Sequence, residues 1–370
     1  MSAKDTLIEI FDYADVKVNG DRPWDIQIHN EDFYSRVMGK GTLGAGESYM
    51  DGWWDVEALD VFFTKMLSID IESKLKKNPV VLLTVLKSVI FNLQRKKIYK
   101  VGEEHYDIGN DLYAKMLDDR LTYTCGYWKN ADNLNQAQED KLDLICRKIN
   151  LKKGDRVLDI GSGFGSFLNF AAEKYGAECT GITISKEQAK FANDNSKGLP
   201  VKTIVKDYME LDGQYDHIVS IGMFEHVGKK NYRKFFEKAH SLLKDNGLFL
   251  LHTIGASKRS GGSGDPWVEK YIFPHGELPS MDRVMEATDR LFITEDFHNF
   301  GYDYSLTLEA WRENFEKNWD SLKDKYDERF YRMWQYYLNT FIGTFRTRNN
   351  HLWHFVFAKK GVAGGYTSVR

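Results

Sequence analysis

The chain has 370 residues, a formal net charge of −3 and hydrophobic side chains at 42% of its positions. This length suggests two domains or one large domain with additions, and the composition is that of a folded chain. The nearly balanced charge does not suggest attraction to nucleic acid, and no uncharged run approaches the ~20 residues that a membrane span needs. Because the start lacks a signal-peptide pattern, we expect a cytoplasmic protein that is soluble or lies on a membrane without crossing it.

Residues 1–100 are predicted to be mainly helical. The most apolar segment is Pro79–Leu93, where the proline suits the first turn of a helix, and a basic cluster follows at residues 95–97 and Lys100. An apolar helix beside a cationic patch could dock on anionic lipid, and a core helix with a solvated basic end is the alternative. We expect a smaller, helical, lipid-associated domain at 1–100 and a second domain at 101–370.

The three cysteines have neither metal-ligand spacing nor an even count for a disulfide framework. This fits a reducing cytoplasm, and no metal site is predicted. Cys146 and Cys179 fall in a predicted helix and a predicted strand, so we interpret both as core residues. Cys125 is considered with the site residues below.

From about residue 136, helices and strands are predicted to alternate. Five apolar runs indicate strands, namely "DRVLDIG", "ECTGITI", "VKTIV", "DHIVSIG" and "LFLLHTIG", and "HLWHFVFAKK" near the end indicates one more. Segments with helical spacing follow the first, second and fourth of these runs. This alternation is typical of βαβ units that build a parallel sheet covered on both faces. A Gly/Ser-rich loop is predicted at 255–265.

The stretch "VLDIGSGFGSF" carries a glycine turn after the first of these strands. Gly161, Gly163 and Gly165 follow a strand and open a helix, the context that a nucleotide-binding fingerprint requires. Glycine lets the backbone approach a ligand with no Cβ in the way. With Asp159 ahead of it, the G-x-G-x-G spacing resembles the first motif of class I S-adenosylmethionine methyltransferases. In that class the acidic residue faces the methionyl ammonium group of the cofactor.

The end of the second strand lacks the acid that usually binds the ribose of a bound nucleotide. The sequence there is "GITISKEQ", with no acid before Glu187. Thr183 and Gln188 could form hydrogen bonds to a ribose instead.

Polar residues also follow the fourth and fifth strands. Glu225 and His226 stand against Met and Phe in "SIGMFEHVG", and His252 lies in "LLHTIG". Ligands of open α/β sheets bind at the carboxyl ends of the strands, so Glu225 and His252 are candidate site residues. A solvated loop position is the alternative for Glu225, and we interpret His226 as structural.

Taken together, these motifs resemble the cyclopropane-fatty-acyl-phospholipid synthase family. The matching stretches include "LGAGESYMDGWW", "EHYDIGNDLY", "YTCGYW", "DPWVEKYIFP" and "HNFGYDY", and they run in order from about residue 43 to 311. The resemblance implies an α/β fold of class I methyltransferases. This is a Rossmann-like, mostly parallel seven-stranded sheet with helices on both faces, preceded by a smaller, mainly helical N-terminal domain. Residues 101–370 would then be the S-adenosylmethionine-dependent catalytic domain.

The resemblance also implies a reaction. In that family a cis double bond of a phospholipid acyl chain attacks the sulfonium methyl group of S-adenosylmethionine. A base then removes a proton from the methylated carbocation, and the cyclopropane ring closes. The base is taken to be a bound bicarbonate ion. The groups that would hold the bicarbonate here are Cys125, Glu225, His252, Tyr304 and the backbone around Ile254.

The cofactor contacts implied by the resemblance lie in four stretches of the chain. They are Tyr123 with Thr124, the Val157–Gly165 loop with Asp159, Gly161, Gly163 and Gly165, the run from Thr183 to Gln188, and Asp207 with Tyr208 beside the adenine. Ser162 and Phe164 depart from the family's usual "GCGWG", and a loop lined by backbone tolerates both. Phe341 stands where some relatives have a cysteine, which argues against a nucleophilic thiol there. We interpret His105 and Tyr106 as covering the cofactor.

The expected partners are phospholipid acyl chains at the inner face of the membrane, with peripheral association, no nucleic acid, and a homodimer as the assembly. The basic cluster after Leu93 is the first candidate for docking on lipid, and Lys258–Arg259 is the second. Three alternatives remain open. They are a methyltransferase that acts on another small or lipid substrate, a relative that gives a branched acyl chain, and a lipid-binding module without catalysis.

Overall fold

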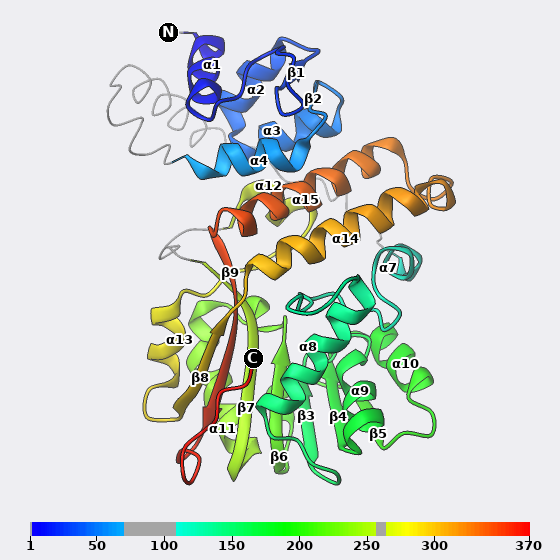
Figure 1. Ribbon diagram of the computed structural model, residues 1–370, viewed down its shortest axis with the longest axis vertical. Coiled ribbons are helices and arrows are strands. Elements are labelled where there is room, and N and C mark those ends of the chain that lie inside the picture. The colour runs from blue at the N-terminus through cyan, green and yellow to red at the C-terminus, as the bar shows by residue number, and fades with distance from the viewer. Residues whose placement is uncertain (1, 70–108, 257–263) are drawn as a thin grey trace. The chain divides into compact units, whose positions relative to one another are not determined.

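Figure 1 shows the computed structural model, in which residues 2–69, 109–256 and 264–370 are described. The predictions for Pro79–Leu93, the basic cluster at 95–97 with Lys100, His105–Tyr106 and Lys258–Arg259 lie outside the described residues. None of the helices within the described ranges is long and apolar enough to cross a membrane.

The chain forms two compact units, and each is described by itself. The helical unit comprises Met1–Leu112, Ser263–Pro274 and Trp311–Asn349, and the sheet unit comprises Tyr113–Gly262, His275–Ala310 and Asn350–Arg370. The helical unit therefore includes two segments from the second half of the chain. These two segments lie after residue 100, so a single boundary at that residue does not separate the two units.

The helical unit is held together by aromatic side chains. Its helices and short strands are α1 (Ala3–Tyr13), β1 (Gln27–Ile28), α2 (Asp32–Lys40), α3 (Thr42–Met50), β2 (Trp54–Asp55), α4 (Leu59–Ser68), α12 (Pro266–Tyr271) and α15 (Glu328–Arg346), with the short 3₁₀ turn η4 (Trp319–Ser321). The rings of Trp54 and Phe62 lie 5.4 Å apart, and the ring of Tyr336 on α15 lies 4.5 Å from that of Trp267 on α12. Large aromatic side chains contribute most to the burial of a small core, so α12 and α15 complete this unit.

The sheet unit contains seven strands in the order β5-β4-β3-β6-β7-β9-β8. They are β3 (Arg156–Ile160), β4 (Glu178–Thr183), β5 (Val201–Val205), β6 (Tyr215–Ile221), β7 (Leu243–Ala256), β8 (Ile293–Asn299) and β9 (Asn350–Ala358). The pairs from β5 to β7 are parallel, and β9 is antiparallel to both of its neighbours. The predicted mostly parallel seven-stranded sheet is thus confirmed. Strand β8 was not predicted from the sequence.

Helices cover both faces of this sheet (Figure 1). The helices of the unit are α8 (Leu134–Lys148), α9 (Ser166–Tyr175), α10 (Lys186–Asn195), α11 (Tyr232–Leu242), α13 (Met281–Thr288) and the first part of α14 (Tyr302–Asn318), and α7 (Asn110–Met116) begins in the helical unit. Three short 3₁₀ turns, η1 (Tyr208–Glu210), η2 (Phe224–His226) and η3 (Lys229–Asn231), follow β5 and β6.

Successive residues of each strand serve different cores. Val157 packs with α8 and α9 on one face, and Leu158 packs with α11 and α13 on the other, as the two-residue period of a strand requires. Cys146 and Cys179 are both buried in the core with α8 and α9, so their interpretation as core residues is confirmed.

The strand order reverses between β3 and β6, because β4 and β5 extend from β3 on one side while β7, β9 and β8 extend from β6 on the other. The loops after β3 and β6 therefore diverge, and such a switch point is where open α/β sheets bind ligands. The glycine turn predicted to bind a cofactor follows β3, and the candidate site residue Glu225 follows β6.

Gly343 should be essential for the packing of α15 on α4. A Cβ at this position would lie 2.9 Å from the Cβ of Phe63 and 3.0 Å from its carbonyl carbon. We expect Gly343→Ala to lower the free energy of unfolding by about 1–3 kcal/mol through overpacking. The matched control is Gly39→Ala on α2, where a Cβ meets nothing within 4 Å. That change should be neutral or stabilising by up to about 1 kcal/mol. Urea unfolding followed by near-UV circular dichroism measures both, and equal midpoints for the two variants would contradict this packing.

Candidate active site

The glycine turn after β3 combines one tightly packed position with one open position. Gly161, Gly163 and Gly165 have φ values of 90°, 52° and 83°, a region that side chains with a Cβ avoid. The amides of Gly161 and Ser162 donate to the carbonyl oxygen of Ile182 at 3.0 and 2.9 Å, which anchors the turn to β4. A Cβ on Gly161 would strike Met223, whereas a Cβ on Gly163 would meet nothing within 4 Å. The backbone of Gly163 is therefore the part of the turn that a ligand can approach.

Asp159 is a buried carboxylate at the end of β3. Only 2% of the residue is exposed, and its Oδ1 atom has no hydrogen-bond partner within the described part of the chain. Burial raises the pKa of this carboxyl to about 7, and the charge of Lys141 opposes that rise. A buried acceptor without a donor is costly, and a ligand ammonium group would satisfy it. This geometry fits the methionyl ammonium of S-adenosylmethionine.

The residues predicted near the ribose lie together at the end of β4. The Thr183 hydroxyl donates to Gln188 Oε1 at 2.9 Å and accepts the amide hydrogen of Ser185 at 3.1 Å. The hydroxyl of Ser185 in turn caps α10 by accepting the amide hydrogen of Gln188. The Gln188 side chain is thereby held at its oxygen, and its amide hydrogens are oriented away from Thr183.

Asp207 and Tyr208 follow β5. Asp207 caps the 3₁₀ turn η1 by accepting the Met209 amide hydrogen at 2.9 Å. The ring of Tyr208 packs edge-on against Phe235 with centroids 5.5 Å apart. Both side chains thus have structural partners that fix them at this edge of the sheet.

Tyr123 belongs to an aromatic group around the glycine turn. Its ring lies 5.1 Å from that of Tyr113, and Tyr113 lies 6.0 Å from Phe164. Phe164 is the residue that replaces the family's usual tryptophan, and it also packs edge-on against Phe191. An aromatic side chain is therefore accommodated at this position of the turn.

Thr124 and the buried Lys141 connect the segment before α8 to the sheet. The methyl group of Thr124 lies 2.6 Å from the position that a Cβ on Gly222 would take, and the hydroxyl of Thr124 accepts a hydrogen from Lys141 Nζ at 3.0 Å. Burial lowers the pKa of Lys141 to about 8 despite the nearby charge of Asp118. Lys141 was not predicted as a site residue, although its place on the buried stripe of α8, between Gln138 and Ile145, was a usable signal.

Glu225 is fully enclosed after β6. Its Oε1 atom accepts the amide hydrogen of Ile254 at 2.6 Å, and its Oε2 atom is buried without a partner in the described ranges. Burial raises the pKa of this carboxyl to about 7, with the Ile254 hydrogen bond acting against the rise. The neighbouring His226 is exposed. The structure therefore brings Glu225 and Ile254 together, and the alternative of a solvated loop for Glu225 is wrong.

His252 is buried on β7, the neighbour of strand β6, which Glu225 follows. Its Nδ1 atom lies 2.8 Å from Nε2 of His354, a residue that the sequence analysis did not single out. Burial lowers the pKa of both imidazoles well below the ordinary value, so both rings are neutral near pH 7. His252 makes no further side-chain hydrogen bond within the described residues, which leaves Nε2 for a ligand.

Tyr304 lies in the first part of α14, and Cys125, in the segment before α8, packs against the same part of that helix. The Cys125 thiol donates to the carbonyl oxygen of Gly126 at 3.1 Å and lies 4.0 Å from the hydroxyl of Thr307. Tyr304 is one turn of helix before Thr307 and is buried. Burial raises the pKa of Cys125 well above its ordinary value, so this side chain is a thiol and a poor nucleophile at neutral pH.

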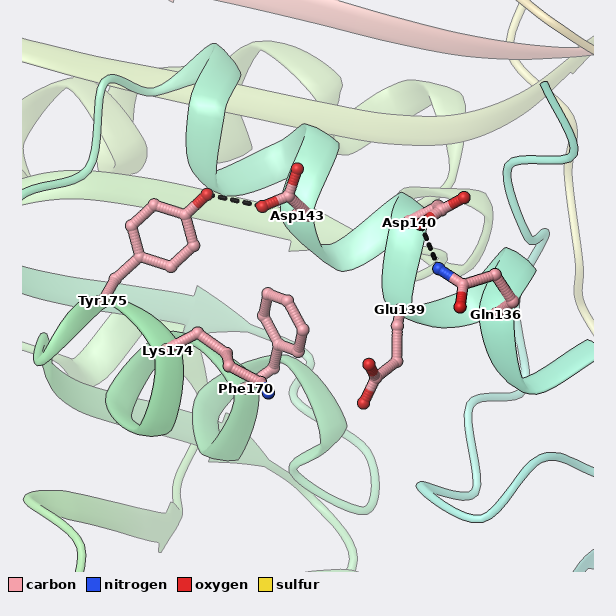
Figure 2. A pocket seen from close by; sticks show the side chains of 7 residues that line it. All are labelled: Gln136, Glu139, Asp140, Asp143, Phe170, Lys174 and Tyr175. Carbon is pink, nitrogen blue, oxygen red and sulfur yellow. Dashed lines mark hydrogen bonds between the residues drawn. The ribbon is translucent and has the colours of Figure 1, made fainter. Parts of the chain in front are cut away.

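A hollow of about 360 Å³ lies elsewhere, between α8 and α9 (Figure 2). Its lining is mainly polar and charged: Gln136, Glu139, Asp140, Asp143, Phe170, Lys174 and Tyr175. Two of its acids already have donors, because Tyr175 donates to Asp143 and Gln136 donates to Asp140, each at 2.6 Å. None of the predicted site residues lines this hollow. Within the described ranges there is also no cluster of side chains that could hold a metal ion.

The glycine turn at the switch point of a mostly parallel sheet, together with the buried acid before it, defines the class I methyltransferase fold. Solved structures support this class. The cyclopropane synthase MmaA2 from Mycobacterium tuberculosis aligns with a TM-score of 0.65 and 29% identity, over 69% of this chain and 96% of that one. The mycolic acid cyclopropane synthase CmaA1, solved in complex with SAH and CTAB, aligns with a TM-score of 0.63 and 31% identity, over 68% and 95%.

The family model described as mycolic acid cyclopropane synthetase matches residues 93–355, and the chain belongs to this family. The cyclopropane-fatty-acyl-phospholipid synthase of Escherichia coli strain K12 is 48% identical over 363 residues, which is 98% of this chain and 94% of that protein. A probable fatty acid methyltransferase from Pseudomonas putida is 38% identical over 247 residues, 63% of this chain and 62% of that protein. The resemblance found in the motifs is thus confirmed.

The charge state of Asp159 should control cofactor binding. S-adenosylmethionine presents an ammonium group, so the ionised carboxylate binds it and the protonated carboxyl does not. With a pKa of about 7 in the free protein, affinity should rise roughly tenfold per pH unit below pH 7 and level off just above it, before the amino group of the ligand begins to lose its proton near pH ~8. Isothermal titration calorimetry from about pH 5.5 to 7.5 measures this. Asp159→Asn should bind weakly with a flat profile, and a wild-type affinity that is independent of pH would contradict the assignment.

Proposed function

We propose that this protein transfers a methylene group from S-adenosylmethionine to the cis double bond of an unsaturated phospholipid acyl chain and forms a cyclopropane ring. The observation that carries this proposal is the enclosed Glu225, with one oxygen held by the Ile254 amide and the other left for a ligand. Membership of the family and 48% identity to a cyclopropane-fatty-acyl-phospholipid synthase over almost the whole chain support the same activity.

The reaction requires a dry site with one accurately placed base. Bound S-adenosylmethionine supplies an electrophilic methyl group, and a bound bicarbonate ion supplies the base. Glu225 Oε2 would accept the hydroxyl hydrogen of the bicarbonate, and a protonated Nε2 of His252 would donate to one of its oxygens. The Cys125 thiol and the Tyr304 phenol would complete the cage. Since water would capture a carbocation, the burial of Glu225, His252 and Cys125 is itself part of this function.

Where the enzyme meets its lipid is also part of the proposal. Acyl chains lie in a bilayer, so the protein must associate peripherally with the inner face of the membrane, with the helical N-terminal region as the lipid-associated part and a homodimer as the assembly. The basic cluster at 95–97 is the proposed docking site for anionic lipid. Relatives described as fatty acid methyltransferases keep a branched product open as the second candidate.

The product distinguishes these two candidates. We expect purified enzyme, vesicles of an unsaturated phosphatidylglycerol and S-adenosylmethionine with a fully deuterated methyl group to give an acyl chain that retains two deuterons and has lost its alkene. Mass spectrometry and proton NMR of the released fatty acids measure both features. Retention of all three deuterons would show methyl transfer and would overturn cyclopropanation.

Glu225 should be required for turnover and dispensable for cofactor binding. Glu225→Gln keeps the shape of the side chain and replaces an acceptor oxygen by a donor, so kcat should fall by about 10²–10⁴. The Kd for S-adenosylmethionine should stay unchanged, and added bicarbonate should restore part of the activity. His226→Gln, at the exposed neighbouring position, is the matched control and should keep full activity. Full activity of Glu225→Gln in bicarbonate-depleted buffer would exclude the proposed cage.

A further inference from the structure

Three histidines stand side by side in one row across the sheet. His252 on β7 is directly opposite His354 on β9, and His354 is directly opposite His298 on β8. β9 lies between β7 and β8 in Figure 1, so His354 is the middle member of the row. Cross-strand partners project from the same face of a sheet, which places the three rings on one side. Only His252 belongs to the predicted bicarbonate cage.

The contact between His252 and His354 fixes a relation between their protons. The two nitrogens lie 2.8 Å apart, and both residues are at most 1% exposed. A hydrogen bond at this distance between two neutral imidazoles contains one proton, so one ring donates and the other accepts. Two arrangements satisfy this condition. In one of them Nε2 of His252 carries a proton toward the cage, and in the other it carries a lone pair.

In the first arrangement His354 Nε2–H donates to His252 Nδ1, so the proton of His252 stands on Nε2 and can be donated to an anion. In the second arrangement His252 donates from Nδ1, and its Nε2 presents a lone pair that would repel an oxyanion. His354 Nδ1 has no partner within the described residues. Each arrangement leaves one ring N–H without a partner in the described residues, on His252 Nε2 in the first and on His354 Nδ1 in the second. His354 Nδ1 is among the fully buried atoms without a partner and His252 Nε2 is not. The first arrangement therefore puts the N–H at the position that a ligand can reach, and the second would seal it in the protein.

The charged and titratable groups around His354 favour neutral rings. Its pKa is lowered mainly by burial, and also by the charges of Lys148 and Lys141 on α8 and by His298 on β8. The ring of Phe300 packs edge-on against it at 4.8 Å and excludes other partners from that side. A neutral His354 with a fixed ring carries no charge, so it can influence His252 only through which of its ring nitrogens carries the proton.

We infer that His354 is a positioning residue that holds His252 in the tautomer with its proton on Nε2, so that His252 donates to the oxyanion of the cage. The inference rests on the proposed function for the identity of that anion, whereas the tautomer itself is a property of the protein alone. The logic is that of other ligand-binding histidines, in which the hydrogen bond at one ring nitrogen sets what the other nitrogen can do.

The direct test is the tautomer of His252 in the cofactor-free protein. In full-length enzyme labelled with ¹⁵N-histidine, long-range ¹H–¹⁵N correlation spectra distinguish a protonated from an unprotonated ring nitrogen, and His252→Asn assigns the signals. We expect a protonated Nε2 and an unprotonated Nδ1 in the wild type. In His354→Phe, which keeps a ring at this position and removes the donor, we expect a mixture of both tautomers. A proton on Nδ1 in the wild type, or an unchanged tautomer in His354→Phe, would overturn the inference.

Kinetics provide the second readout. His354→Phe should lower kcat by about 10²-fold, with KM for lipid and Kd for S-adenosylmethionine within about threefold of wild type, because His252 then donates only in part of the molecules. His354→Gln can donate an amide hydrogen to His252 Nδ1 and should recover at least half of the lost activity on a logarithmic scale. Equal kcat for the wild type and a folded His354→Phe enzyme would show that His354 is structural.

The two proposals fail separately. If bicarbonate has no effect on the rate while the spectra show the expected change in tautomer, the cage fails, and the control of the His252 tautomer by His354 stands. If Glu225→Gln behaves as expected and the spectra show no change, the proposed function stands and the role of His354 is excluded. Should His354→Phe not fold, the His354→Gln spectra decide, because a proton on Nδ1 of His252 in that variant and in the wild type contradicts the inference.

Discussion

Two buried carboxyl oxygens without hydrogen-bond partners in the described chain, one on Asp159 and one on Glu225, are the constraint on which the rest of the site depends. An ionised carboxylate is expensive to bury, and the pKa of each group is raised to about 7 for that reason. The fold tolerates this cost at the switch point of the sheet, where the loops after β3 and β6 diverge and a ligand can supply the missing partners. Buried acids with raised pKa values in such a crevice are typical of functional sites.

The two carboxylates would bind different partners. Asp159 ends β3 beside the glycine turn, where a cationic cofactor group would neutralise it. Glu225 is held by a backbone amide and would share a proton with an anion. Lys141 is the buried cation that acts electrostatically on Asp159, Cys125 and His252. A single ammonium at this place would stabilise negative charge in the proposed cage, and it adds to the burial that keeps the imidazole of His252 neutral. A neutral imidazole with a fixed tautomer donates one hydrogen in one direction, which a rotating or fully charged ring would not.

How much of this site could be read from the sequence depends on whether its contacts are local. Three parts of the site come after strands with clear apolar runs: the glycine turn, Thr183 with Gln188, and Glu225. Their place at the carboxyl ends of the parallel strands could therefore be predicted. His354 could not, because its relation to His252 is set by the register of β7 and β9, which are about a hundred positions apart in the chain. Strand β8 was missed because it is an edge strand with the polar sequence "ITEDFHN" and no apolar run. The inclusion of α15 in the helical unit depends on aromatic contacts between distant segments, such as Phe63 with Tyr336, that no local pattern encodes.

The histidine row has a second chemical consequence for a reaction that passes through a carbocation. Such an intermediate alkylates any accessible lone pair, so a protein that forms it must keep its own nucleophiles occupied. Cys125 meets this condition because burial keeps it a thiol. With His354 as the donor, the Nδ1 lone pair of His252 would meet it as well, and a proton on Nε2 would remove the other lone pair from the ring. In the proposed cage the thiol and the imidazole would thus be masked, and the bound base would be left to react with the cation. The hydrogen bond that is proposed to orient His252 toward the oxyanion would then also protect this ring from the intermediate.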